Sequence, residues 1–346
     1  MMTINHDELK QKIAAIFGAA GCQGDEPRCI SHHLVEANLV GHDSHGVIRV
    51  PTYVKWLGEG NVLANRELRM VSDQETIAIV DGDLGFGQVM GERVMQLAID
   101  KASRYGVGVI GLRNTGHLGR IGDWVTQAVD EGKIAICMVN TSGLGILVAP
   151  FGGVERRLSA NPIAVGIPVK GRTPIILDIS TCAIAEGKIM VAMHKGETVP
   201  DECLIDAEGN PTNDPEVFYA DVPGAILPFG GHKGFGLGIV VDVLSGALAG
   251  GSCSHPGEDC LRQSMLSIVI DPDRFQPQDI LTGEIHRFID FVKSSRTKNA
   301  ATEILMPGEI EQRTRHYRLE HGIELDKTTW GQLCALGQQL NVSGID

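Results

Sequence analysis

The sequence predicts a mixed helix-and-strand protein in which a central body with α/β patterning lies between helical ends. Three observations support this. Helical periodicity dominates residues 6–60, short apolar runs of β type recur between about residues 76 and 280, and beyond that point the pattern is helical and charged. We therefore expect a discontinuous helical domain formed by residues 1–75 and 281–346, with residues 76–280 inserted as a second domain.

The composition indicates a folded protein whose surface does not suit nucleic acid or anionic membranes. Hydrophobic residues make up 43% of the 346 residues and charged residues 21%, which is ordinary for a globular chain. The formal net charge of -13 would repel phosphate groups, so we expect neither a nucleic-acid nor a membrane partner. The eight cysteines are scattered without a CxxC pair, and no secretory signal is visible. We therefore expect a cytoplasmic protein.

Three helices are predicted before residue 60. In the first, the apolar side chains that share one helical face are Leu9, Ile13, Ile16 and Phe17. A second helix is predicted from about Glu26 to Val40. It leads into a polar turn, and a third helix follows over residues 47–60.

The central body alternates between the two kinds of pattern. Runs typical of strands cover residues 76–80, 107–112, 134–139, 164–167, 175–177 and 266–270. Helical patterns cover residues 88–104, 120–131, 182–193 and 234–249. Loops containing proline and glycine at 195–230 and 251–260 are interpreted as surface excursions.

The first chemically interesting motif is the turn Gly41-His-Asp-Ser-His-Gly46, with Arg49 just beyond it. It places two imidazoles, a carboxylate and a hydroxyl in one loop. Histidine suits proton transfer near neutral pH, and an arginine can bind a carboxylate through two nitrogens. A polar helix-capping turn, with Asp43 or Ser44 as the cap, explains the same composition. Both interpretations stay open at this point.

Two further glycine-containing loops join a strand to a helix. In Asn114-Thr-Gly-His-Leu-Gly-Arg120, the side chains of His117 and Arg120 could reach a ligand, or the loop could be an ordinary connection. The glycines at 85, 87 and 91 give GxGxxxG, a weak match to a dinucleotide fingerprint. Nearby aspartates would repel a pyrophosphate, so close packing is the favoured interpretation of these glycines.

Three other segments are less specific. Gly230-Gly-His-Lys-Gly-Phe-Gly236 opens an apolar helix and could contact a phosphate or a ribose. The turn Met306-Pro-Gly-Glu309 is unremarkable when taken alone. The Cys253–Cys260 loop matches no common zinc spacing, so we expect no metal site.

Taken together and in order, seven segments resemble the type II malate/L-lactate dehydrogenase-like family of 2-hydroxy-acid oxidoreductases. They are residues 41–49, 116–122, 148–152, 161–162, 177–181, 232–234 and 306–309. The resemblance covers nearly the whole chain. It implies an α+β fold with a non-Rossmann cofactor-binding domain, a largely antiparallel mixed sheet and a helical domain formed from both termini. It also implies a homodimer, a small 2-oxo or 2-hydroxy acid as substrate, and NAD or NADP as cofactor.

The resemblance also implies roles for individual residues. His45 is the expected proton donor to the substrate carbonyl, with Ser44 beside it, and Arg49 is the expected partner of the substrate carboxylate. His117 lies where some relatives place a second catalytic histidine. The expected cofactor contacts are His45, Gly119, Arg120, Ile121, Ile176, Leu177, Asp178, Ile179, Ser180, His232, Gln263, Gly308, Glu309, Ile310 and Glu311.

Two departures from the family pattern bear on the substrate. Many relatives have a threonine where this chain has Ala160, so a hydroxyl contact is missing here. The imine-reducing members carry an aspartate at the position of Lys188, which weighs against cyclic imino acids such as piperideine- or pyrroline-2-carboxylate. The alternatives are such an imine reductase, a non-catalytic NAD-binding protein or a metal-dependent enzyme. NAD is favoured over NADP because no obvious basic cluster awaits a 2′-phosphate.

Overall fold

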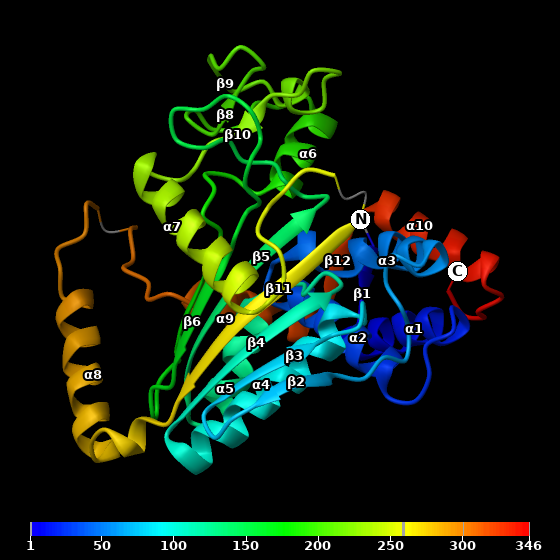
Figure 1. Ribbon diagram of the computed structural model, residues 1–346. Coiled ribbons are helices and arrows are strands. Elements are labelled where there is room, and N and C mark those ends of the chain that lie inside the picture. Colours follow the sequence, from blue (N-terminus) through cyan, green and yellow to red (C-terminus); the bar gives the residue numbers. More distant parts are fainter. Residues whose placement is uncertain (1, 258–259, 300, 346) are drawn as a thin grey trace.

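A seven-stranded sheet forms the centre of the computed structural model, which describes residues 2–257, 260–299 and 301–345 (Figure 1). The strands follow the order β2-β3-β4-β11-β5-β6-β7. Their bounds are β2 Arg69–Asp73, β3 Ile77–Asp81, β4 Val107–Thr115, β5 Ile134–Gly143, β6 Ile163–Ile167, β7 Ile175–Ile179 and β11 Leu261–Ile270. Only β3 and β4 pair in parallel within this described sheet, and the other neighbours are antiparallel. The sheet is therefore mixed and largely antiparallel.

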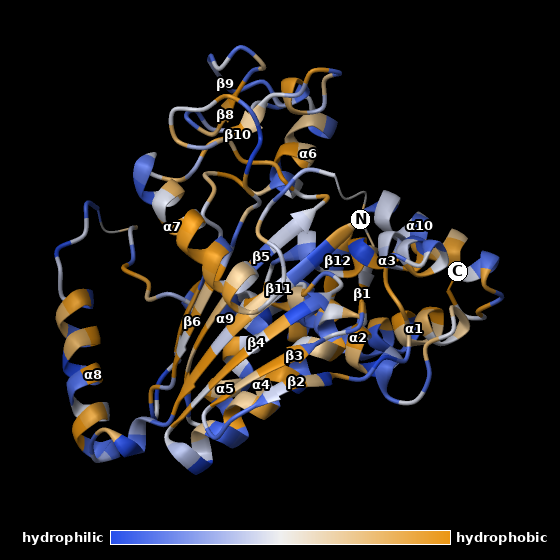
Figure 2. Ribbon diagram, viewed as in Figure 1, coloured by the Kyte–Doolittle hydropathy of each residue, from blue (hydrophilic) through white to orange (hydrophobic). Residues whose placement is uncertain are grey.

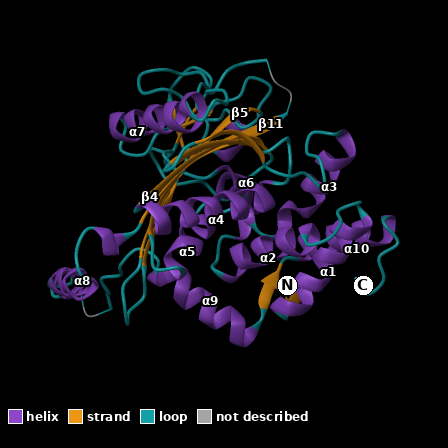
Figure 3. Ribbon diagram, turned by 60° about the horizontal axis from the view of Figure 1, so that its bottom comes forward, coloured by secondary structure: helices purple, strands orange, loops and turns teal. Residues whose placement is uncertain are grey.

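Helices cover both faces of the sheet, as Figure 3 shows. Helices α4 (Gly87–Tyr105) and α5 (Gly122–Asp130) pack on one face. Helix α7 (His232–Asp242) lies on the other face and continues as a π-helical turn over Val243–Leu248. Apolar side chains of α7 bury the strand residues Met138 and Leu266 on that side. Because both faces are covered, the strands read as apolar runs in the sequence.

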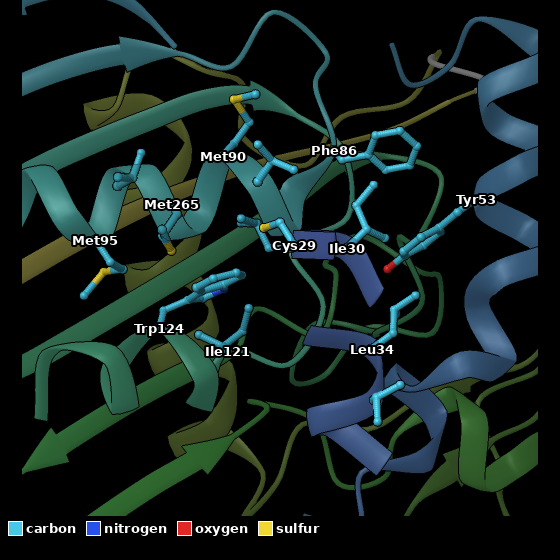
Figure 4. Packing of buried hydrophobic residues seen from close by; sticks show 14 of the residues in the cluster. Cys29, Ile30, Leu34, Tyr53, Phe86, Met90, Met95, Ile121, Trp124 and Met265 are labelled. Carbon is cyan, nitrogen blue, oxygen red and sulfur yellow. The ribbon is translucent and has the colours of Figure 1, made fainter. Parts of the chain in front are cut away.

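The two ends of the chain lie side by side. Strand β1 (Met2–Ile4) pairs antiparallel with β12 (Ile323–Leu325). The helices of these ends are α1 His6–Ala19, α2 Glu26–Leu39, α3 Val50–Glu59, α9 Glu309–His321 and α10 Lys327–Gln339. The main buried cluster joins α2 to the central body, and Figure 4 shows Ile30 and Leu34 in this cluster together with Phe86 and Trp124. The division into two domains stays a prediction.

Local sequence explains where the terminal helices begin. The Asn5 side chain accepts the amide of Asp7 at 2.8 Å and caps α1. The predicted apolar face of α1, from Leu9 to Phe17, is fully buried. Asp326 caps α10 by accepting the amide of Thr329 at 2.8 Å.

The glycines at 85–91 serve close packing, as the sequence analysis favoured. A Cβ on Gly87 would lie 2.2 Å from the carbonyl oxygen of His117, and one on Gly91 would lie 2.6 Å from the Trp124 ring. A larger residue at 87 would push α4 away from the loop that carries His117, and one at 91 would push α4 away from Trp124 of α5. Gly87 therefore sets how closely that loop approaches α4.

The interpretation of residues 195–230 as a surface excursion is wrong for much of the segment. Val199, Leu204 and Phe218 are buried in a second apolar cluster together with α6 (Glu186–Lys195). This cluster forms a small lobe that also contains a three-stranded sheet of β8 (Leu204–Ile205), β9 (Pro211–Thr212) and β10 (Ala225–Ile226). The short strands lack the alternation that would reveal them in the sequence.

Helix α8 (Gln278–Lys293) extends along one side of the molecule with few contacts to it (Figure 1). Ile289 is its one buried side chain within the described residues, whereas Phe288 and Phe291 are exposed. Figure 2 shows apolar positions along both α8 and α7. Among the described residues, no helix has the length and apolarity required to cross a bilayer.

Candidate active site

A cavity of about 610 Å³ separates the small lobe from the main body. Such a volume suits a small ligand together with part of a cofactor. The side chains of its wall come from segments far apart in the chain, among them His45, Arg49, His117, Arg120, Asp178, Lys188 and Gln263. The polar motifs around residues 45 and 117 therefore share one site.

The turn that carries His45 is held from both sides. It is a 3₁₀ turn over Asp43–His45 that follows the end of α2. From the inside, the Asn38 side chain donates to Asp43 at 2.6 Å and accepts the amide of Val47 at 2.9 Å. From α9, Arg318 donates to both carboxylate oxygens of Asp43 at 2.7 and 3.0 Å. Asp43 is therefore an anchor of the turn, not a helix cap.

Gly46 is required at its position by this packing. A Cβ there would lie 2.2 Å from the side-chain oxygen of Asn38. Its φ of −86° is accessible to any residue, so the requirement is space and not backbone conformation. The motif thus ends in glycine because the buried Asn38 amide sits against it.

Arg49 and Ser44 are arranged around His45. The Nε of Arg49 donates to the backbone oxygen of Ser44 at 2.6 Å, which orients the guanidinium. Within the described part of the chain, its two terminal nitrogens make no hydrogen bond, so both can bind a carboxylate in a bidentate contact. The Oγ of Ser44 lies 3.1 Å from Nδ1 of His45. Ser44 therefore contacts the imidazole and leaves Nε2 for a ligand.

Hydrogen bonds define the tautomer of His117. Its Nδ1 accepts the amide of Gly119 at 3.2 Å and lies 2.6 Å from the hydroxyl of Tyr53. An amide can only donate, so Nδ1 carries no proton and the neutral ring carries it on Nε2. Gln88 donates to the Tyr53 oxygen at 3.1 Å and completes the chain. His117 is therefore a neutral imidazole that can donate from Nε2.

The two imidazoles lie nearly parallel, with ring centroids 5.7 Å apart and an interplanar angle of 15°. Burial lowers the pKa of His45 to about 3, with further lowering by the nearby positive charges of Arg49 and Arg120. Burial, Arg49 and His45 also lower the pKa of His117 well below its ordinary value. Without a bound anion, both rings are neutral at pH 7. His45 can then accept a proton at Nε2, whereas His117 can donate a hydrogen bond from Nε2.

Gln263 and Asp178 hold the loop of His117 in place. Gln263 accepts the amide of Leu118 at 2.7 Å and donates to Thr141 at 2.9 Å. Asp178 accepts the amide of Gly122 at 2.8 Å. Both side chains also face the cavity, so they combine a structural role with a place on its wall.

Arg120 is a buried cation with an incomplete set of partners. Its Nη1 donates to Asp123 at 2.7 Å, and its Nε lies 3.6 Å from Asp178. The Nε atom is buried and has no hydrogen-bond partner among the described residues. A buried donor without a hydrogen bond, on a residue that lines a cavity, indicates a position where a ligand oxygen would be favourable.

The structure brings together most, but not all, of the residues that the sequence analysis selected. The selected residues that line the cavity are Ser44, His45, Arg49, His117, Gly119, Arg120, Ile121, Asp178, Ser180 and Gln263. Those outside its wall are Ile176, Leu177, Ile179, His232, Gly308, Glu309, Ile310 and Glu311. Their assignment as cofactor contacts stays a prediction.

Several of the selected residues outside the cavity wall nevertheless contact residues or strands close to the cavity. Glu311 lies 3.5 Å from His42, a cavity residue. Ile176 donates its amide to the oxygen of Pro307 at 3.0 Å, so the 306–309 turn lies against β7. The carboxylate of Glu309 accepts hydrogen bonds from the ammonium group of Lys293, 2.5 Å away, and from the amide of Met306. His232 meets the Phe151 ring.

The sequence analysis missed three residues that shape the site. Tyr53 lies within the third predicted helix but was given no role in the site, and Gln88 and Thr141 were not singled out. Their polar atoms meet His117, Tyr53 and Gln263 respectively. A buried tyrosine normally has a partner for its hydroxyl, but the sequence does not show which one.

Comparison with known proteins identifies the family. The family model described as malate/L-lactate dehydrogenase matches residues 4–334. The chain belongs to the malate/L-lactate dehydrogenase family. Hydroxycarboxylate dehydrogenase B of Escherichia coli (strain K12) is 37% identical over 339 residues, 96% of this chain and 93% of that protein.

Solved structures of family members share the fold. The sulfolactate dehydrogenase of Methanocaldococcus jannaschii superposes with a TM-score of 0.88 at 34% identity, covering 99% of this chain and 98% of that one. The Δ1-piperideine-2-carboxylate reductase of Pseudomonas syringae pv. tomato gives a TM-score of 0.86 at 29% identity, with 97% and 100% covered. The α+β fold expected from the sequence is thereby confirmed.

Proposed function

We propose that this chain catalyses the reversible, nicotinamide-dependent reduction of 2-oxo acids to 2-hydroxy acids, with His45 moving the proton. The general assignment as an oxidoreductase of 2-hydroxy acids follows from the family. The observation that carries the proposal is the convergence of His45, Arg49 and His117 on one cavity. One group for the carboxylate and two for the carbonyl oxygen are what a 2-oxo acid requires.

Arg49 binds the substrate carboxylate through its terminal nitrogens. The hydrogen bond from its Nε to Ser44 fixes the plane of the guanidinium, so little freedom is lost on binding. A hydrogen bond to a charged group contributes about 1.5–3 kcal/mol. This contact also sets the distance from the substrate C2 oxygen to the imidazoles, because Arg49 and His45 belong to adjacent turns.

His45 holds the proton that the C2 oxygen gains or loses. In the oxidation of a hydroxy acid, the neutral ring accepts the hydroxyl proton, and Ser44 accepts Nδ1–H as the ring becomes charged. In reduction, the protonated ring donates to the oxygen. The negative charge of a bound carboxylate offsets Arg49 and makes that protonation easier. His117 donates from Nε2 to the same oxygen and stabilises the charge that develops on it.

The residues around Arg120 fit the nicotinamide cofactor that the family implies, which supplies or accepts the hydride at C2 when bound. Arg120 lines the cavity, and its buried Nε makes no hydrogen bond within the described residues, although Asp178 lies 3.6 Å from it. Asp178 and Ser180 offer oxygen atoms beside it. We propose that these residues, with Gly119 and Ile121, hold the cofactor.

NAD is the proposed cofactor in preference to NADP. Among the segments 119–121, 176–180 and 308–311, Arg120 is the one cationic side chain, and Asp123 pairs with it. The carboxylates of Asp178 and Glu311 would repel a 2′-phosphate. NADP-binding sites usually place an arginine at that phosphate.

A cyclic imino acid reductase is the second candidate, because one structural neighbour has that activity. Lys188 argues against it. The residue lies on the cavity wall in this chain, and an ammonium group there repels a protonated imine.

A second copy of the chain is the proposed partner. The exposed apolar side chains of α7 and the following turn are Ile239, Val240, Val243 and Leu248, and those of α8 are Ile280, Phe288 and Phe291. Exposed apolar patches on a protein surface often mark interfaces with other proteins. Light scattering should give twice the chain mass, and Phe291→Glu should shift it toward the monomer. A monomeric wild-type protein would exclude this partner.

The function is tested by a panel of substrates with purified protein. Reduced NAD and reduced NADP are each offered with 2-oxoglutarate, phenylpyruvate, oxaloacetate, pyruvate and piperideine-2-carboxylate, and oxidation of the cofactor is followed by its absorbance. We expect turnover of at least one 2-oxo acid, faster with NAD. Turnover of the imine alone, or of none of these compounds, would contradict the proposal.

A further inference from the structure

We propose that Cys29, His33 and Glu92 form a binding site for one zinc-type divalent cation, at a distance from the catalytic cavity. The three residues lie between α2 and α4, and their potential ligand atoms are all within 4.8 Å of one another. None of the three lines the cavity described above. No step of the proposed reaction uses them.

The spacing of the three side chains fits a small tetrahedral ion. Glu92 Oε2 lies 3.4 Å from Cys29 Sγ and 3.4 Å from His33 Nε2. Zinc bonds of about 2.0–2.3 Å to nitrogen, oxygen and sulfur place tetrahedral ligands about 3.3–3.6 Å apart. Glu92 thus stands at ligand spacing from both other side chains, and all three potential ligand atoms lie within 4.8 Å of one another, so an ion between them requires a modest rearrangement.

Helix geometry explains why Cys29 and His33 face the same point. They are four residues apart in α2, so both side chains lie on one face of the helix. Glu92 approaches from the first turns of α4, which the close contact of Gly91 with Trp124 holds in place. The ligands therefore stand on rigid helices instead of loops.

Asp123 prepares His33 as a ligand. Its carboxylate lies 3.2 Å from Nδ1 of His33, on the side of the ring away from Cys29 and Glu92. A carboxylate on one nitrogen places the proton there and turns the lone pair of the other nitrogen toward the ion. This carboxylate–histidine arrangement is common behind zinc ligands, and it is an observation independent of the three-residue cluster.

Burial and ligand type decide which ion fits. Cys29 is buried, whereas the side chain of Glu92 is 41% exposed and opens the site to solvent. A thiolate and an imidazole select zinc over magnesium and calcium, which prefer oxygen ligands. The three protein ligands leave a fourth position for water.

The site is separated from the cavity by two residues. Asp123, which orients His33, also accepts a hydrogen bond from Arg120 at 2.7 Å, and Arg120 lines the cavity. An ion bound to His33 would therefore change the electrostatic environment of Asp123, the carboxylate that also binds Arg120 of the cavity.

Metal binding to the intact protein tests the proposal. Equilibrium dialysis should show one tightly bound zinc per chain, and cobalt should give the absorption of a thiolate-to-metal charge transfer. Cys29→Ser should abolish this absorption, and Glu92→Gln should weaken zinc binding at least tenfold. Both changes preserve side-chain size. Cys334→Ser, at a half-buried thiol of α10, is the control and should bind as the wild type does.

The ring of Trp124 gives a second, local readout. It lies 4.7 Å from the His33 ring, so bound cobalt should quench its fluorescence, and Trp124→Phe should remove most of the quenching. Absence of a one-to-one complex in the wild type would overturn the proposal. Equal zinc affinity in the wild type, Cys29→Ser and Glu92→Gln would overturn it as well, whether or not the chain reduces 2-oxo acids.

Discussion

The hydroxyl of Tyr53 lies 2.6 Å from Nδ1 of His117, and this contact joins a terminal helix to the loop that follows β4. Burial raises the pKa of Tyr53 to about 12, so the phenol stays protonated at neutral pH and donates a hydrogen bond to Nδ1 of His117. The imidazole is thereby fixed in the tautomer that presents Nε2–H to the cavity. Tyr53 is a positioning residue that acts through His117.

Replacing Tyr53 by Phe tests this relationship. The ring still fills its site, but one of the two donors to Nδ1 is lost. We expect kcat to fall about tenfold, equivalent to about 1.4 kcal/mol, with little change in KM for the 2-oxo acid. A purely structural role would lower the melting temperature and leave kcat of the folded fraction unchanged, so both are measured.

Removal of the His45 imidazole should be far more damaging. A positioned general acid or base contributes about 10²–10⁴ in rate, so His45→Ala and His45→Gln should each lower kcat by that factor. The dissociation constant of the cofactor, measured by fluorescence titration, should change much less. Activity within a few-fold of wild type would exclude His45 as the group that moves the proton.

How far the fold could be predicted depended on burial. Helix α1 was foreseen because its buried positions repeat at helical spacing, and β4 because both its faces are covered. Strand β2 was missed because Arg69–Asp73 is largely exposed at the sheet edge and shows no alternation. The order of strands depends on contacts between distant segments, which apolar periodicity does not encode.

The same distinction applies to the site. Ser44, His45 and Arg49 occupy two adjacent turns within six residues, so local sequence showed them together. Tyr53 and His117 are 64 positions apart, and their contact depends on how α3 packs. The cluster of Cys29, His33 and Glu92 was not predicted either, because Glu92 belongs to another helix, 59 positions beyond His33.

Gly46→Ala tests the packing of the His45 turn. The new methyl group would meet Asn38 at 2.2 Å, so Asn38 must move and release Val47 or Asp43. Overpacking of this kind costs about 1–3 kcal/mol of unfolding free energy, and kcat should fall as well. Gly58→Ala is the matched control, because that position in α3 is open and exposed. Equal stability of the two variants in urea would refute the packing argument.

The pH dependence of the reaction follows from the lowered pKa of His45. Burial and neighbouring positive charges keep the free enzyme's ring neutral well below pH 6.5, the ordinary midpoint of histidine. Since kcat/KM reports the free enzyme, its acid limb for hydroxy-acid oxidation should lie well below pH 6.5. For 2-oxo-acid reduction, which needs the protonated ring, the rate should fall as the pH rises.

The two profiles are measured on one preparation at constant ionic strength. A bound carboxylate offsets the charge of Arg49, so the acid limb of kcat for oxidation should lie at higher pH than that of kcat/KM. If the acid limb of kcat/KM lies at or above pH 6.5, the base of the oxidation is not a His45 imidazole whose pKa is lowered.

Lys188 should favour substrates that carry a second acidic group. Its exposed side chain lies on the cavity wall, on the first turn of α6. An exposed ion pair contributes about 0.2–1 kcal/mol, which corresponds to at most about a fivefold change. We therefore expect Lys188→Ala to lower kcat/KM for oxaloacetate or 2-oxoglutarate by about two- to fivefold. Pyruvate should be affected little.

Lys195→Ala provides the control for this experiment. Lys195 ends the same helix and is exposed, but it does not line the cavity. Its replacement removes the same charge from the same helix, so a general electrostatic effect would appear in both variants. A loss confined to Lys188→Ala and to dicarboxylic substrates would place the substrate side chain against α6. An equal loss for pyruvate would show that Lys188 does not distinguish substrates by charge.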